Sequence, residues 1–352
     1  MLSFISYIWI NNIKDLKKKL SIVDIANSLN ISKTTVSFIL NGRAREKRIS
    51  EELVERVLKY VKEVGYKPNS LAKSLRTGKS NIIGLLVQDI SNNFFASIAR
   101  QIEDRAYKNG YKIIYSSTDN DTQKTQELIA MFRDRHVDGY IIVPPEGIEE
   151  DISALIKDGL PVVLFDRYLP KVETDYVVVD NLFSTYNATR YLIDKGYKNI
   201  AFISFNSQQT QMVDRFEGYK KAINESKLKT CIKEIDFHQD EKLITEPILA
   251  FLNEHKETDA ILFGNNHLGT CGLKVIRELG IKVPEELALI SFDDNVVFEL
   301  CNPPVTAIAQ PIDDIADKVI TILLNRLNTS VEVEAKQHIT LPTDLRIRNS
   351  TR

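Results

Sequence analysis

The stretch SIVDIANSLNISKTTVSFILNG, residues 21–42, decides the fold expected at the start of this chain. Apolar residues recur at helical spacing on both sides of a short turn at residues 29–31, which predicts two small helices, each packed through one apolar face. Ser21 and Ser32 stand just before the two apolar runs, where a serine hydroxyl can cap the first turn of a helix. Two short helices joined by such a turn are typical of a helix-turn-helix, whose second helix can enter the major groove of DNA.

A third helix is expected after Ser50, because Leu53, Val57 and Val61 repeat the same apolar spacing. We expect Ser50 to cap this helix and Gly65 to end it. A polar segment that opens with a proline-asparagine pair follows, which predicts a linker between the small helical head and the rest of the chain.

Beyond Asn81 the pattern changes to short apolar runs that alternate with longer amphipathic stretches. Continuous apolar runs separated by helices predict parallel strands covered on both faces. The alternation restarts after Asp180, so two α/β lobes are expected. Ligands of such sheets bind beyond the carboxyl ends of the strands, so two facing lobes predict a cleft. The expected strands are 82–87, 111–117, 138–143, 161–165, 199–204, 231–237, 259–263 and 287–291, and the expected helices are 94–109, 121–135, 149–158, 182–195, 211–225, 241–254 and 267–279.

The net charge of −2 hides a strong asymmetry along the chain. Residues 1–80 carry 16 Lys and Arg against 7 Asp and Glu, whereas the remaining 272 residues carry 30 basic and 41 acidic side chains. A head with a net charge of +9 on a body with −11 favours a polyanion as the partner of the head. A solvated basic surface without a partner is the alternative that charge alone leaves open.

Cysteine usage and the absence of targeting signals favour a reducing cytoplasm. Cys231, Cys271 and Cys301 are odd in number and widely spaced, which predicts neither a disulfide framework nor a zinc site. The apolar run at residues 1–10 lacks the basic start and the small-residue cleavage site of a signal peptide. No stretch approaches the ~18 uninterrupted apolar residues of a membrane helix. We therefore expect a cytoplasmic protein without a membrane partner.

Motifs of catalysis and cofactor binding are missing from the sequence. No two of the 14 glycines are separated by one residue, which excludes the G-x-G-x-x-G dinucleotide motif. Gly78-Lys79-Ser80 resembles the end of a phosphate-binding loop, but Lys73 stands where that loop requires its first glycine. The five histidines lack H-E-x-x-H spacing. We expect no enzyme activity, no catalytic residue, no cofactor and no metal, while a site assembled only by folding stays open.

From about residue 21 onward the chain resembles the LacI/GalR family of transcription regulators. The matching segments keep the family's order and spacing: VDIANSLNISKTTVSFILNG, ISEELVERVLKYVKEVGYKPNSLAKSLRTGKSNIIGLLVQDISNNFF, VDGYIIVP and PEELALISFDD. A helix-turn-helix followed by GYKPNSLAKSLRTGK and a sensor lobe is highly specific for this family. The resemblance implies an α/β protein with a small all-α head and a two-lobed sensor domain of the periplasmic-binding-protein type, made of parallel sheets.

The resemblance implies a homodimeric, sequence-specific DNA-binding regulator whose heads read a pseudo-palindromic operator. It favours repression, and it favours a sugar or sugar derivative as the small-molecule effector bound between the lobes. The expected division of the chain is an extension of unassigned role (1–19), a helix-turn-helix head (20–67), a hinge (68–80) and a two-lobed effector-binding and dimerisation domain (81–352).

The residues expected to contact DNA lie in the second helix and in the hinge. Lys33, Thr34 and Ser37 are polar and exposed in the expected helix, and they can reach base edges and phosphates. The resemblance implies that Leu75 enters the minor groove as an apolar wedge. Many relatives have VSRVLN where this chain has VSFILN, so Phe38 cannot make the charged contact of an arginine. The full set is Ser32, Lys33, Thr34, Thr35, Ser37, Phe38, Asn41, Ala72, Lys73, Leu75 and Arg76.

The resemblance also implies a set of effector contacts in the cleft. The polar members follow expected strand ends or begin the next helix, where a cleft would reach them. Their carboxylate, amide and guanidinium groups can bond to hydroxyls, and phenylalanine faces can stack on a ring. A core position for the phenylalanines and a surface ion pair for Asp166 and Arg167 are the alternatives. The expected contacts are Phe94, Phe95, Asp166, Arg215, Phe237, Asn265 and Asp293.

Other functions stay open at this point. A purine-like ligand or a protein co-regulator could replace the sugar as the effector. A periplasmic solute-binding protein would share the two lobes, but it needs an export signal and has no use for a basic helical head.

Overall fold

The computed structural model describes residues 20–66, 78–237, 240–328 and 335–351. The chain separates into two compact units, residues 1–80 and residues 81–352. The amino-terminal extension lies outside the described residues. So do the four expected hinge contacts with DNA, Ala72, Lys73, Leu75 and Arg76.

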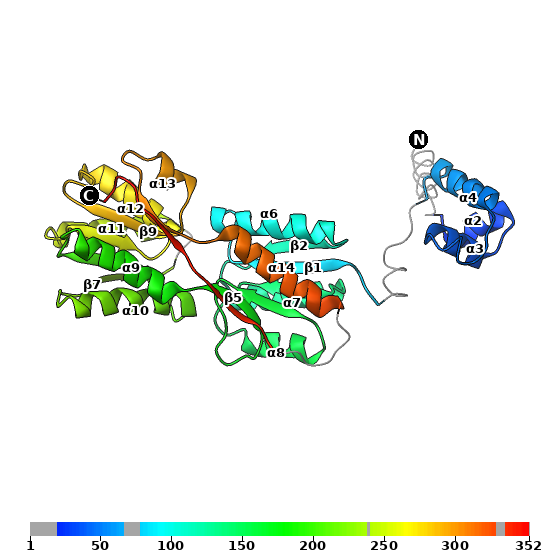
Figure 1. Ribbon diagram of the computed structural model, residues 1–352, viewed down its shortest axis with the longest axis horizontal. Coiled ribbons are helices and arrows are strands. Elements are labelled where there is room, and N and C mark those ends of the chain that lie inside the picture. Colours follow the sequence, from blue (N-terminus) through cyan, green and yellow to red (C-terminus); the bar gives the residue numbers. More distant parts are fainter. Residues whose placement is uncertain (1–19, 67–77, 238–239, 329–334, 352) are drawn as a thin grey trace, which may run out of the picture. The chain divides into compact units, whose positions relative to one another are not determined.

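The first unit contains three short helices, α2 (Ile22–Leu29), α3 (Lys33–Leu40) and α4 (Glu51–Glu63), labelled in Figure 1. Between α2 and α3 the chain turns at Asn30, whose left-handed backbone (φ 54°) asparagine tolerates better than most residues. The apolar faces of the helices meet in a small core of Ile25, Ala26, Val36, Ile39 and Val57. The predicted helix-turn-helix head is present.

One of the three expected serine caps is absent. Ser21 and Ser32 each accept a hydrogen bond from the first turn of the helix that they precede. Ser50 stands at the N-cap of α4, but its side chain makes no capping hydrogen bond, so this expectation was wrong. The first turn of α4 carries Glu51 and Glu52, whose negative charges interact favourably with the positive end of the helix dipole.

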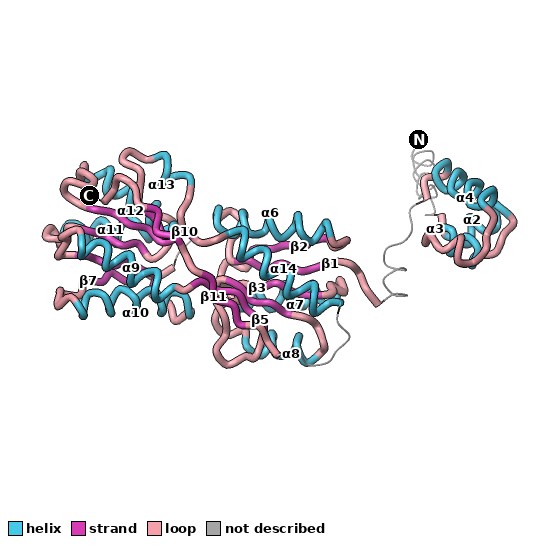
Figure 2. The backbone as a smooth tube through the Cα atoms, viewed as in Figure 1, coloured by secondary structure: helices cyan, strands magenta, loops and turns pink. Residues whose placement is uncertain are grey.

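The second unit contains two six-stranded sheets, drawn in magenta in Figure 2. The sheet of the first lobe has the order β11-β5-β4-β3-β1-β2, and that of the second lobe has the order β12-β10-β9-β8-β6-β7. Apart from the antiparallel edge strand β12, the two lobes repeat one parallel topology. The strands are β1 (Ile82–Val87), β2 (Lys112–Ser117), β3 (Gly139–Ile142), β4 (Val162–Phe165), β5 (Asp175–Val179), β6 (Ile200–Phe205), β7 (Cys231–Ile235), β8 (Ala260–Phe263), β9 (Ala288–Phe292), β10 (Thr306–Ala309), β11 (His338–Leu341) and β12 (Asp344–Arg346).

Helices cover both faces of each sheet, which explains why the strands are continuously apolar. In β1, Ile83 and Leu85 enter the core beside α6, whereas Leu86 enters the core beside α7 on the opposite face. In the first lobe, α6 (Asn93–Lys108) and α14 (Ile312–Asn328) share one face, and α7 (Thr122–Asp134) and α8 (Glu149–Lys157) share the other. In the second lobe the pairs are α9 (Asn181–Asp194) with α10 (Thr210–Glu225) and α11 (Lys242–Glu254) with α12 (Asn266–Leu279), and the short α13 (Val296–Leu300) follows β9.

All the expected strands and helices of the body are present, with ends that agree within two residues. The elements β5, α13, β10, α14, β11 and β12 were not predicted. Although α14 follows the second lobe in sequence, it packs against α6 in the first lobe (Figure 1), where Ile315, Val319 and Leu323 join the core. The chain therefore crosses between the lobes after β5, after β10 and between β11 and β12.

Gly218 allows α10 to lie very close to α9. A Cβ atom at this position would be 2.2 Å from the carbonyl oxygen of Leu182 and 3.0 Å from the backbone nitrogen of Tyr186. Both of these atoms belong to the backbone of α9, so neither can move aside by changing a side-chain rotamer. The close packing of α9 against α10 therefore requires glycine at position 218.

We expect Gly218→Ala to lower the free energy of unfolding by about 1–3 kcal/mol, because the extra methyl group must push two helix backbones apart. Urea denaturation followed by circular dichroism measures the change. Glu217→Ala, at an exposed position one residue earlier in α10, is the matched control and should change stability little. Equal stability of the two variants would contradict the close packing.

Candidate functional sites

The amino-terminal end of α3 presents the expected DNA contacts of the head. Lys33 and Thr34 are exposed, whereas Thr35 and Ser37 are partly buried beside the core. The hydroxyl of Ser32 accepts a hydrogen bond from the backbone nitrogen of Thr35 at 2.9 Å, so Ser32 caps the helix that carries these contacts. Lys33 and Thr34 are therefore accessible at the start of α3, the end of the second helix that contacts base edges in a helix-turn-helix.

Phe38 lies next to a charged loop rather than alone on the helix surface. The guanidinium of Arg43 and the ammonium of Lys47 lie 5.7 Å and 5.4 Å from the centre of its ring. Glu46 binds Arg43 through two hydrogen bonds of 2.7 Å and 2.6 Å. The exposed Asn41, at the end of α3, donates its side-chain amide to the carbonyl oxygen of Ser37. Phe38 thus packs against two basic side chains through cation–π contacts.

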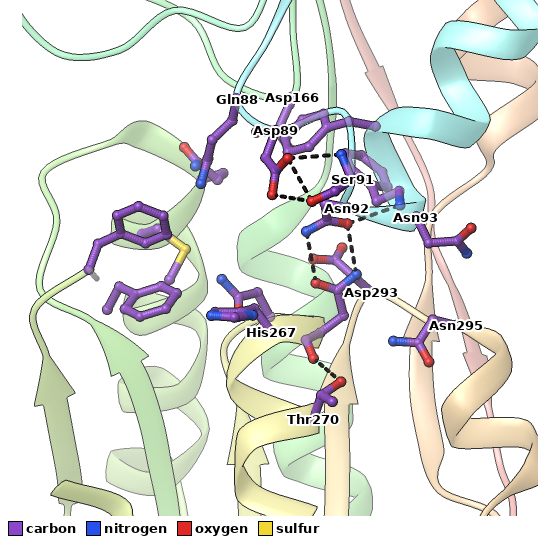
Figure 3. A pocket seen from close by; sticks show the side chains of 18 of the residues that line it. Gln88, Asp89, Ser91, Asn92, Asn93, Asp166, His267, Thr270, Asp293 and Asn295 are labelled. Carbon is purple, nitrogen blue, oxygen red and sulfur yellow. Dashed lines mark hydrogen bonds between the residues drawn. The ribbon is translucent and has the colours of Figure 1, made fainter. Parts of the chain in front are cut away.

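A cavity of about 670 Å³ lies between the lobes, and Figure 3 shows it from close by. Its walls come from the carboxyl ends of strands and the first turns of the following helices, as expected for α/β sheets. The structure brings all seven expected effector contacts to its lining: Phe94, Phe95, Asp166, Arg215, Phe237, Asn265 and Asp293.

Asp166 and Asp293 occupy equivalent positions in the two lobes. Each directly follows a central strand, β4 or β9, and each has a left-handed backbone, with φ of 68° and 64°. This conformation is uncommon for residues other than glycine, although aspartate tolerates it better than most. Asp293 is held in place by Gln310, which donates to its Oδ1 atom at 2.6 Å. The repeated topology thus places one carboxyl group in the cavity from each lobe.

Arg215 is buried on α10 beneath the cavity, with 2% of its surface exposed. Its Nε donates to Asn181 Oδ1 at 2.8 Å, and its Nη1 donates to the carbonyl oxygen of Gly264 at 2.8 Å. Nη1 also lies 3.7 Å from a carboxylate oxygen of Asp293, and the guanidinium stacks 3.5 Å from the centre of the Phe292 ring. These partners fix the guanidinium before any ligand binds.

The alternative surface ion pair between Asp166 and Arg167 is not what the structure shows, because both side chains are buried. Arg167 Nε lies 3.4 Å from Asp166 Oδ2. Burial raises the pKa of the Asp166 carboxyl above its usual range, against the opposing effect of the neighbouring guanidinium groups. Burial likewise lowers the pKa of Arg167. A hydrogen-bond donor from a ligand would compensate the desolvated Asp166 carboxyl group.

The phenylalanines serve as both core and cavity wall. Phe94 and Phe95 begin α6, are almost fully buried, and meet edge to face with ring centres 5.0 Å apart. On the second lobe, Phe237 lies beyond the end of β7, is 36% exposed, and packs against Phe205 at 5.3 Å. Two aromatic surfaces therefore border the cavity, one from each lobe.

An amide pair connects the two lobes at the cavity. Asn92 donates to Asn266 Oδ1 at 3.3 Å, and Asn266 donates back to Asn92 Oδ1 at 3.2 Å, as Figure 3 shows from Asn92. Asn265 caps α12 by accepting from the backbone nitrogen of Leu268 at 2.9 Å. Asn265, one of the expected effector contacts, therefore also caps α12. The first residue of α12 is Asn266, which bonds to Asn92 of the first lobe.

Several polar lining residues were missed by the sequence analysis. They include Gln88, Asp89, Asn92, Gln211 and Asn266. Gln88 and Asp89 directly follow β1, so the strand-end rule could have found them. Gln211 carries no such signal, because it lies in the first turn of α10, several residues after the end of β6.

Carboxyl groups are the most numerous ionisable groups in the cavity wall. Among the described residues that line it, five are carboxylates (Asp89, Asp119, Asp166, Glu241 and Asp293), and Arg215 is the arginine. His267 also lines the cavity, and burial lowers its pKa, which favours the neutral ring. Four of the five carboxylates have a basic ion-pair partner: Asp119 has Lys124, Asp166 has Arg167, Glu241 has Lys274 and Asp293 has Arg215.

Within the described ranges, no group of three or more His, Cys, Asp or Glu side chains could hold a metal ion. Nor is any described helix both long and apolar enough to cross a membrane.

Comparisons with known proteins relate both units to characterised families. Residues 21–69 match the family described as bacterial regulatory proteins, lacI family, and residues 189–351 match the periplasmic binding protein-like domain. The HTH-type transcriptional regulator DegA of Bacillus subtilis (strain 168) is 31% identical over 346 residues, which cover 95% of this chain and 98% of that protein.

Two solved structures share the fold. The lac repressor dimer bound to operator and the anti-inducer ONPF has a TM-score of 0.82 at 20% identity, covering 95% of this chain and 99% of that chain. A periplasmic binding protein/LacI transcriptional regulator from Alkaliphilus metalliredigens QYMF, complexed with D-xylulofuranose, has a TM-score of 0.68 at 24% identity, covering 77% and 99%.

We expect Ser32→Ala to destabilise α3 by about 1 kcal/mol, because its hydroxyl caps the helix. Amide hydrogen exchange of the full chain should show faster exchange in α3. Ser50→Ala is the matched control and should have a smaller effect on α4, since Ser50 makes no capping bond. Equal effects of the two substitutions on their helices would contradict the assignment of the caps.

Proposed function

The chain belongs to the lacI family of bacterial regulatory proteins, and we propose that it represses transcription under the control of an uncharged sugar bound between its lobes. It is a DNA-binding transcription regulator with an effector-binding domain. The single observation that supports the sugar is the cavity itself, whose wall combines carboxylates with aromatic surfaces.

The charge of the wall favours a neutral ligand over an anion. A phosphorylated sugar, a nucleotide or a sugar acid would compete with the wall's carboxylates for basic side chains that these carboxylates already pair with. Two of the three guanidinium nitrogens of Arg215, Nε and Nη1, already donate to Asn181 and Gly264, and Asp293 compensates its charge. Carboxylates accept hydrogen bonds and do not donate them when ionised, so the wall favours a ligand with several hydroxyl donors.

The aromatic surfaces favour a ligand with an apolar face. Phe94 from the first lobe and Phe237 from the second can pack against the C–H face of a sugar ring, while Asp166 and Asp293 accept from its hydroxyls. A cavity of about 670 Å³ has the size of a small-molecule site and admits a monosaccharide or a disaccharide.

The DNA-binding part of the proposal rests on the head. We propose that Lys33, Thr34 and Ser37 contact bases, and that the hinge residues, Leu75 among them, contact the minor groove. The solved lac repressor is a dimer bound to operator, which supports a homodimer that reads a pseudo-palindromic operator. We place the protein in the cytoplasm, where its DNA lies, and assign it no catalytic activity, since the relatives are transcriptional regulators.

We expect a neutral sugar from a panel of D-xylulose, D-ribose, D-xylose and cellobiose to raise the melting temperature of the full chain. A ligand at 100 times its dissociation constant stabilises the folded state by about 2.7 kcal/mol. D-Xylulose 5-phosphate should give no shift, because the basic side chains at the cavity wall are already paired with carboxylates and cannot compensate its phosphate.

Asp293→Asn is the control for the location of the site, since it keeps the size of the side chain and removes the charged acceptor. It should reduce the sugar-induced shift. A shift from the phosphorylated sugar alone, or an undiminished shift in Asp293→Asn, would contradict the proposed ligand class and site.

A further inference from the structure

A chain of side-chain hydrogen bonds begins at the buried Arg167 of the first lobe. Its Nη2 donates to Gln88 Oε1 at 2.7 Å, and its Nη1 donates to Asn120 Oδ1 at 3.2 Å. The same Asn120 oxygen accepts from Gln209 Nε2 at 2.8 Å, and Gln209 belongs to the second lobe. Gln209 Oε1 in turn accepts from Gln211 Nε2 at 3.1 Å. We call Arg167, Asn120, Gln209 and Gln211 the amide relay.

The amide relay crosses between the lobes beside two other contacts. Glu146 of the first lobe accepts from Ser207 Oγ at 3.3 Å and from the backbone nitrogen of Gln208 at 3.1 Å. The backbone nitrogen of Tyr168 donates to Thr210 Oγ1 at 3.3 Å. The first lobe therefore contacts the segment that leads into α10, residues 207–210, on both sides of Gln209. We call these contacts between residues 207–210 and the first lobe the seam, and the amide relay is part of it.

The guanidinium sets the direction of the whole relay. An arginine can only donate, so Asn120 must turn its oxygen toward Arg167. That oxygen requires a donor from Gln209, which leaves the Gln209 oxygen to face Gln211. Gln211 must then donate its nitrogen as well, and its own oxygen remains at the end of the relay.

The terminal oxygen has no partner among the residues that the structure describes. Gln211 is 6% exposed and lines the cavity, and its buried Oε1 atom accepts no hydrogen bond there. A buried acceptor without a partner is costly, and most such groups in proteins find one. The sugar-binding cavity adjoins the side chain, so a hydroxyl donor can come from a bound sugar.

We propose that Gln211 is a specificity-determining residue whose Oε1 accepts a hydrogen bond from a sugar hydroxyl, with its orientation imposed from the other lobe by Arg167. This contact rests on the proposed function of the cavity. It couples the ligand to the seam, because the amide that accepts from the sugar is two residues from Gln209, which bonds across the lobes. A ligand group that can only accept is disfavoured at this point.

The direction of the relay is tested in the ligand-free full chain by three near-isosteric substitutions that each add one carboxylate. Asn120→Asp keeps the acceptor that the relay uses, whereas Gln209→Glu and Gln211→Glu each remove the required donor. We expect both glutamate variants to melt at clearly lower temperature than the wild type, and Asn120→Asp, whose new carboxylate accepts from Arg167 and Gln209, to melt at the wild-type temperature or above it. Equal melting temperatures of the three variants, or a lower value for Asn120→Asp, would overturn the direction.

The sugar contact is tested by calorimetry with the panel sugar that gives the largest thermal shift. Gln211→Met should weaken its binding about tenfold, the value of one net hydrogen bond. Val213→Ala, exposed on the same helix, is the control and should bind as the wild type does. Unchanged affinity of Gln211→Met would overturn the contact while leaving the proposed function intact. Failure of every panel sugar to bind the wild type would overturn the proposed function and this contact together, whereas the melting temperatures would still decide the relay's direction.

Discussion

The buried guanidinium of Arg215 is the interaction on which the cavity depends. A charge removed from water is tolerated where its donors and its charge find partners. Asn181 at the start of α9 and Gly264 after β8 accept hydrogen bonds from the guanidinium, and Asp293 after β9 compensates its charge. The same group stacks on Phe292, the last residue of β9. Because these partners come from separate elements, the guanidinium joins helix and strand ends into one floor beneath the ligand site.

The first lobe uses its equivalent carboxyl differently. Asp166 has the backbone conformation and strand-end position of Asp293, but its near partner is the neighbouring Arg167. The two terminal nitrogens of Arg167 donate hydrogen bonds to Gln88 and Asn120. Asn120 also accepts a hydrogen bond from Gln209 of the second lobe. The repeated topology therefore places Asp166 and Asp293 at equivalent positions of the two lobes. Their arginine partners differ in role: Arg215 forms the floor of the cavity in the second lobe, whereas Arg167 connects the first lobe to the second.

Much of this arrangement could be predicted from local patterns. The apolar spacing in residues 21–42 predicted the head, and the continuous apolar strands predicted the two-lobed parallel α/β body. The family resemblance gave Asp166 and Asp293, and the strand-end rule agrees with it because both residues directly follow a strand. By contrast, α14 has a clear helical pattern but was not predicted, and no local pattern indicates that it packs in the first lobe rather than the second. The pair Asn92–Asn266 and the amide relay join segments far apart in sequence, so their partners depend on the folded arrangement.

Control of transcription by a small molecule requires that the cavity and the DNA-binding head are coupled. A ligand that prefers one arrangement of the lobes shifts the balance between arrangements, and coupling between sites is reciprocal. The most direct measurement is the affinity of the full chain for an operator selected from random DNA, determined by fluorescence anisotropy with and without a saturating neutral sugar. We predict a change of about fivefold or more, the usual lower bound for such coupling. An unchanged operator affinity, while a thermal shift shows that the sugar is bound, would contradict it.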